Sequence, residues 1–171
     1  MDLLSNILGG QQQQQEYSDF AKRYEKGAPW DGISDEEAYN HHAQIAANVP
    51  PDVYQRSAQD SFSRLAPDQR RELGRCIQQR APQYGVSFPD ADRDGQDDRL
   101  EDPAYLAQMT GRIHQQQPGL LGQILGGGAG GLGGVLGGGG GGGGMLSNPI
   151  AKAALGGIAA MAVKQMMGGR R

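Results

Sequence analysis

Residues 34–81 read SDEEAYNHHAQIAANVPPDVYQRSAQDSFSRLAPDQRRELGRCIQQRA, and this stretch shows helical periodicity in three successive segments. Ser34 is followed three residues later by Glu37, which is a capping-box signal for the start of the first helix. Pro50 and Pro51 end that helix, because the residue before a proline is disfavoured in the helical conformation. Short connections between the segments predict three neighbouring helices that pack against one another.

The second and third segments have their own start signals. Asp52 is expected to cap the second helix, and Pro67 suits the first turn of the third, where its missing N–H costs nothing. Residues at helical spacing line one face of each segment and predict the core: Ala38, His42, Ile45, Val49, Tyr54, Ala58, Phe62, Leu65, Leu73, Cys76, Ile77 and Ala81. The expected fold class is therefore mainly α, with a cluster of three to five short helices.

Further elements are expected on both sides of this stretch. Tyr17, Phe20, Ala21 and Tyr24 predict an aromatic-faced helix over residues 16–26. The run 11–15 is all glutamine and is interpreted as a spacer without a fixed conformation.

Trp30 is expected to plug the end of the helical cluster, and residues 84–88 to form a short extended piece. Asp102 and Pro103 are the N-cap and first-turn residue of a helix that runs to about Gln116.

The composition limits the classes of function. The chain has 171 residues, 29 of them glycine, but only three phenylalanines and one tryptophan, so it is long yet poor in core material. A net charge of −3 gives no general attraction to nucleic acid or to an anionic membrane. Cys76 is the single cysteine, which excludes an internal disulfide. No basic region followed by an apolar run opens the chain, so a cytoplasmic location is expected.

From Gly119 the composition changes to glycine and leucine, with 17 glycines between Gly119 and Gly144. Glycine loses the most backbone freedom on folding, so residues 119–148 are expected to form a disordered tether. The stretch 120–127, LLGQILGG, repeats LLSNILGG at residues 3–10. This repeat is interpreted either as a pair of sticky segments or as a product of the biased composition.

Pro149 is expected to start a last helix that ends near Met167. Lys152 and Lys164 leave only 11 residues between them, about half of what a bilayer requires. Ala153 with Gly157, and Gly156 with Ala160, are small residues four apart, a spacing that lets helices approach closely. Helix-to-helix packing is the favoured prediction, with membrane association as the alternative.

One segment satisfies the calcium-loop pattern of EF-hand proteins, which it resembles over 12 residues. Alternating carboxylates around a glycine turn provide the hard oxygens that Ca²⁺ prefers. The resemblance implies these ligands: Asp90, Asp92, Asp94, Gln96, Asp98 and Glu101. Pro89 before the loop and Pro103 after it depart from the EF-hand pattern, so an acidic solvated linker is the alternative interpretation of residues 89–102.

The remaining polar residues do not form a recognisable active site. His41 and His42 point about 100° apart on a helix, which predicts a core histidine at 42, a solvated one at 41 and no shared metal. Arginines and carboxylates are mixed along residues 52–80, so no nucleic-acid interface is expected. We find no nucleophile, base and orienting acid at a spacing typical of a catalytic site. Neither an enzyme nor a small-molecule substrate is therefore expected.

The LLSNILGG opening and the glycine–leucine tract resemble uncharacterised bacterial proteins of the YidB-like kind. This resemblance carries no catalytic residues. The expected organisation is an apolar turn and glutamine spacer (1–15), a helical domain (16–118), the tether (119–148) and a C-terminal helix (149–171). The expected function is a non-enzymatic bacterial module that binds itself or another protein through helix 149–167. Weak calcium binding and attachment to a membrane surface are the alternatives.

Overall fold

The computed structural model describes residues 10–26, 33–88, 98–126 and 149–168, and these residues are almost entirely helical. The elements are α2 (Gln11–Glu25), α3 (Asp35–Asn48), α4 (Pro51–Ser63), α5 (Pro67–Arg80), η1 (Ala81–Tyr84), η2 (Asp98–Glu101), α6 (Pro103–Gln116), α7 (Leu120–Gly126) and α8 (Pro149–Gly168). No strand occurs in these ranges, which confirms the predicted mainly α fold.

Local signals in the sequence mark the starts of α3, α5 and α6. The Ser34 hydroxyl accepts a hydrogen bond from the Glu37 N–H at 3.1 Å, and the Asp102 carboxylate accepts one from Ala104 N–H at 2.8 Å. Pro67 and Pro103 occupy the first turns of α5 and α6, as expected. Asp52 is not the cap of α4, because that helix already begins at Pro51 and Asp52 lies inside its first turn.

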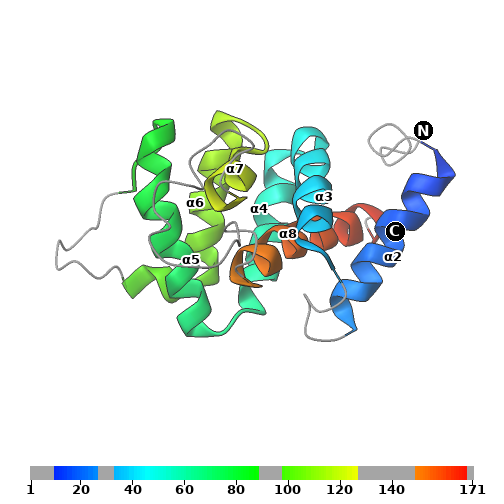
Figure 1. Ribbon diagram of the computed structural model, residues 1–171, viewed down its shortest axis with the longest axis horizontal. Helices are drawn as coiled ribbons and strands as arrows, with labels where there is room; N and C mark the ends of the chain where they lie inside the picture. The colour runs from blue at the N-terminus through cyan, green and yellow to red at the C-terminus, as the bar shows by residue number, and fades with distance from the viewer. Residues whose placement is uncertain (1–9, 27–32, 89–97, 127–148, 169–171) are drawn as a thin grey trace, which may run out of the picture.

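Helix α8 lies at the centre of the molecule. It runs along the long axis between α2 at one end and the α5–α6–α7 group at the other, with α3 and α4 beside it (Figure 1). Its principal neighbours are α2, α3 and α4. All residues from Ala153 to Val163 are buried. A helix that is apolar on every side requires such a position, since no face of it is suited to water.

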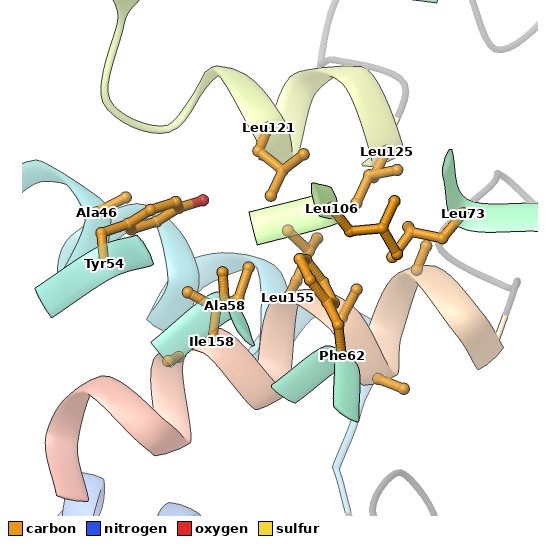
Figure 2. Packing of buried hydrophobic residues seen from close by; sticks show 14 of the residues in the cluster. Ala46, Tyr54, Ala58, Phe62, Leu73, Leu106, Leu121, Leu125, Leu155 and Ile158 are labelled. Carbon is orange, nitrogen blue, oxygen red and sulfur yellow. The ribbon is translucent and has the colours of Figure 1, made fainter. Parts of the chain in front are cut away.

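The remaining core lies between α4 and α6 and the elements around them. Figure 2 shows Leu155 and Ile158 of α8 beside Ala58 and Phe62 of α4. On α5, Gly74 leaves room for Leu100 of η2, whose Cβ lies 3.0 Å from where a Cβ on residue 74 would be. Leu100 is therefore buried, and it anchors the C-terminal part of the acidic segment 89–102 to α5.

Four predictions about the organisation of the chain are wrong. Residues 11–15 belong to α2, because glutamine is a good helix former and the aromatic face of the same helix is anchored in the core. Residues 120–126 are helical and packed rather than part of the predicted tether, and the rest of that tether, residues 127–148, lies outside the described residues. Helices α3, α4 and α5 do not pack chiefly against one another, since α4 packs mainly on α6 and α8 and α3 on α8.

The fourth error concerns the C-terminal helix, which is not a separate unit but shares one core with the helices before it. Residues 86–88 form neither helix nor strand, although Val86 and Phe88 are buried. The predicted apolar turn at residues 1–8 and the plug at Trp30 lie outside the described residues.

Candidate interaction site

The C-terminal helix meets the rest of the fold most closely at two consecutive glycines. A Cβ on Gly156 would lie 3.6 Å from the Ala38 Cβ and 3.7 Å from the Phe20 Cζ. A Cβ on Gly157 would lie only 2.9 Å from the Ser61 Cβ, and it would overlap the hydroxyls of Ser61 and Tyr24. We call the four side chains around these glycines, Phe20, Tyr24, Ala38 and Ser61, the α8 cradle.

Hydroxyl groups of the cradle reach the backbone of α8. The Tyr24 hydroxyl donates to the carbonyl of Ala153 at 3.4 Å, and the Ser61 hydroxyl donates to that of Ala154 at 3.5 Å. These long hydrogen bonds exist because glycine at 157 lets α2 and α4 come this near. Burial raises the pKa of Tyr24, so this phenol stays protonated and able to donate.

Polar and charged side chains near the C-terminal end of α8 bind to α2 and α4. Lys164 pairs with Glu25 of α2, and the Gln165 amide donates to the Asp60 carboxylate of α4 at 3.2 Å. The hydrogen bond from Lys164 lowers the pKa of Glu25. Because these groups are exposed, they determine the register of α8 more than its stability.

The close approach implied by the small-residue pairs of α8 is confirmed, but the neighbours are helices of the same chain. Gly156 faces α3 and α2, and Gly157 faces α4 and α2. Tyr24 lies on the predicted aromatic face, but Ser61 was not predicted as a partner of α8, because a single serine in a polar stretch carries no such signal. None of the described helices combines the length and the apolarity that spanning a bilayer requires.

A second buried feature is a group of three polar rings between α3, α4 and α6, in which His42 meets Tyr54 edge-on and Tyr54 stacks on His114. The His42 Nε2 lies 2.9 Å from the Tyr54 hydroxyl, in a hydrogen bond whose direction depends on the tautomer. The Tyr54 ring is stacked on His114, with centroids 4.0 Å apart and an interplanar angle of 10°. Residue 42 is thus the core histidine that the sequence predicted.

The two neighbouring histidines differ less in burial than expected. His41 is not solvated, because it lies against the rings of Tyr17 and Phe20 and is within 3.7 Å of Glu37. Within the described residues, no three His, Cys, Asp or Glu side chains are grouped so that they would hold a metal ion. Both histidines contact aromatic rings: His41 those of Tyr17 and Phe20, and His42 that of Tyr54.

Most of the predicted calcium ligands lie outside the described residues: Asp90, Asp92, Asp94 and Gln96. Of the other two, Asp98 is exposed on η2, and Glu101 forms an ion pair with Arg71 of α5. This pair raises the pKa of Arg71. Any calcium ion at this loop would compete with Arg71 for the Glu101 carboxylate.

Comparison of the chain with protein-family models, curated proteins and solved structures returned no match in any of the three. The resemblance to YidB-like proteins therefore stays a prediction.

The two glycines of α8 provide a matched pair of substitutions. Gly157→Ala should destabilise the protein by about 1–3 kcal/mol, because the new methyl group overlaps Ser61, whose Cβ is held by the α4 backbone. Gly156→Ala should be neutral or stabilising by up to about 1 kcal/mol, since its methyl group meets only ordinary contacts and alanine favours the helix. Urea unfolding of both variants measures the difference. Equal effects would show that α8 is not seated at Gly157 as described.

The buried histidine predicts a dependence of stability on pH. Burial, with a smaller contribution from His114, lowers the pKa of His42 from 6.5 to about 3. The unfolded state therefore binds more protons than the folded state between these values. Stability should be insensitive to this group above pH 6.5 and should fall by about 1.4 kcal/mol per unit well below it.

Burial also lowers the pKa values of His41 and His114, so the whole-protein slope is a sum over several groups. His42→Gln keeps a hydrogen-bonding group near Tyr54 but removes this titration. Urea unfolding of wild type and variant from pH 7 to pH 4 should show a shallower dependence in the variant. Parallel curves would contradict a neutral buried His42.

Calcium binding through residues 90–101 remains a prediction, with an expected affinity near the millimolar end of the range for such loops. Arg71→Gln should strengthen binding because it frees Glu101, and Asp90→Ala with Glu101→Ala should abolish it. Calorimetric titration with Ca²⁺, and with Mg²⁺ as the control for a merely electrostatic response, tests both. Absence of heat in wild type and in Arg71→Gln would leave residues 89–102 as an acidic linker.

Proposed function

We propose that this chain is a non-enzymatic self-association module in which α8 of one copy can occupy the α8 cradle of another. The observation that carries the proposal is the burial of every residue from Ala153 to Val163 of α8 by helices that precede it in the chain. A helix that is apolar on all sides needs a groove wherever it lies, and each copy of the chain carries one such groove.

The connection to α8 supports exchange. Residues 127–148 separate α7 from α8, and 14 of these 22 residues are glycine. A flexible glycine-rich linker of that length has a root-mean-square span of about 26 Å. Such a link allows the helix to enter its own cradle or that of a neighbour with the same contacts, which is the low-cost route to dimers by domain swapping.

The length of the link also predicts whether the closed monomer or the exchanged dimer dominates. A short flexible link gives the attached helix an effective concentration in the millimolar range at its own cradle. The closed monomer therefore prevails in dilute solution, and exchange grows when the chain is concentrated or locally clustered. The non-enzymatic part of the proposal rests on the polar groups of the core, which hydrogen-bond or stack on one another as packing groups.

Membrane attachment through α8 has less support, because the apolar residues of this helix face the protein interior. A bilayer would have to draw α8 out of the core first.

Disulfide capture between two chains tests the exchange directly. The Ala38 Cβ lies 3.6 Å from the Cβ position of residue 156, within the range of about 3.5–4.5 Å found across disulfides. In a Cys76→Ser background, one chain carries Ala38→Cys and a second, mass-tagged chain carries Gly156→Cys. Mixing at high concentration followed by oxidation should give a linked heterodimer, because only exchange brings these positions of different chains together.

A chain that carries both substitutions should close on itself as an oxidised monomer when dilute. The matched control replaces Gly156→Cys with Gly168→Cys, which lies on the same helix with nothing within 4 Å of its Cβ position. If the heterodimer forms no faster with Gly156→Cys than with Gly168→Cys, α8 does not exchange and the proposal fails.

A further inference from the structure

Helix α7 fills an apolar site with only two turns of chain. Leu120, Leu121, Ile124 and Leu125 are all at most 3% exposed. The Arg80 guanidinium donates to the Ile124 carbonyl at 2.9 Å and so holds the end of the helix. We define the α7 site by the three side chains that meet the α7 backbone, which are Tyr39, His42 and Arg80.

The α7 site contains a polar atom that α7 does not satisfy. His42 is completely buried, and its Nδ1 has no hydrogen-bond partner in the described part of the chain. This Nδ1 lies 3.5 Å from where a Cβ on Gly122 would be. Leaving a buried nitrogen unpaired is unfavourable, and glycine at position 122 has no side chain to pair with it.

The start of the chain repeats the α7 sequence with a hydroxyl at that position. Residues 3–10 and 120–127 are identical at six of eight positions, including all four apolar residues. Ser5 corresponds to Gly122. A serine hydroxyl both donates and accepts, so it suits His42 whichever ring nitrogen carries the proton.

The geometry of the fold determines which copy of the chain supplies this segment. Gly10 is the last residue of the repeat and the N-cap of α2. Helix α2 starts at the end of the long axis opposite the α5–α6–α7 group, with α3, α4 and α8 between them (Figure 1). The segment is joined directly to the start of α2, so a neighbouring molecule can present it to the α7 site without the chain having to fold back past α3, α4 and α8.

We propose that residues 3–10 of a second copy of this chain bind in the α7 site in place of α7, with the Ser5 hydroxyl hydrogen-bonded to His42 Nδ1. The apolar residues of the incoming segment replace those of α7 one for one. The contact joins different surfaces of the two molecules, so it generates closed rings, of which a reciprocal dimer is the smallest, or open filaments.

Two effects make this contact weak and therefore reversible. The segment must displace α7, which is covalently attached beside the site. The Tyr39 ring, 3.0 Å from the Cβ position of residue 122, must also shift by a few tenths of an ångström to admit Ser5. The hydrogen bond from Ser5 to His42 strengthens the binding of the segment.

The test uses the full-length chain and a synthetic amidated peptide of residues 1–10, observed through the NMR signals of the His42 imidazole and the Tyr39 ring. The peptide should shift both sets of signals at millimolar concentration. A Ser5→Ala peptide should bind about tenfold more weakly, because it lacks one buried hydrogen bond. An Asn6→Gln peptide, which only copies Gln123 of α7, should bind like the parent peptide.

Leu121→Ala in the full-length chain should tighten binding of the parent peptide, since it weakens the seating of α7. Unchanged His42 and Tyr39 signals in both the wild-type chain and Leu121→Ala would overturn the proposal. Equal affinity of the parent and Ser5→Ala peptides would also overturn it, by removing the assigned contact. Disulfide capture between α3 and α8 involves none of these residues, so its outcome is independent of this one.

Discussion

The rest of this structure depends on the burial of a helix that has no polar face. An isolated helix of about this length containing two adjacent glycines is marginal in water, so α8 exists because the surrounding helices cover it. Those surrounding helices depend on α8 in turn. Each of α2, α3 and α4 has one apolar face, and each would leave that face exposed if α8 were absent. Residues at the two ends of the chain thus depend on each other: Phe20 and Tyr24 of α2 are buried by α8, and Ala153 to Val163 are buried in part by α2.

The contacts at Gly157 explain why α8 is built from small residues rather than from leucine. With glycine at this position, the helix backbone comes close enough for the hydroxyls of Tyr24 and Ser61 to reach its carbonyls. Those carbonyls already accept bonds within the helix, so the added contacts contribute orientation more than strength. Dispersion forces between closely packed backbones provide the attraction that larger side chains supply elsewhere. The resulting groove has the shape of one particular helix, and a bulkier apolar segment would not enter it.

The sequence predicted those parts of the fold that depend on neighbours along the chain. Ser34, Pro67 and Asp102 mark helix starts through contacts within one turn, so α3, α5 and α6 could be placed before any packing was known. The prediction failed for α7 because a glycine-rich segment has little helix preference of its own, and for residues 11–15 because a run of one residue type was interpreted as a spacer although glutamine is a good helix former. Their helicity follows from burial of Leu121 and Ile124 in one case and of Tyr17 and Phe20 in the other. For α8, the small residues predicted close packing against another helix, but nothing in the sequence identified which helix that is.

At position 122, close packing and hydrogen bonding favour different residues. Packing favours glycine, because the Tyr39 ring leaves room for little else. Hydrogen bonding favours a hydroxyl, since His42 Nδ1 is buried beside it without a partner. The structure has the closely packed glycine and leaves the His42 Nδ1 unpaired, which costs about 1–3 kcal/mol for a typical buried polar group. In the exchange proposed for this site, an incoming segment with a hydroxyl at this position would pair the His42 Nδ1, and this gain would offset part of the cost of displacing α7.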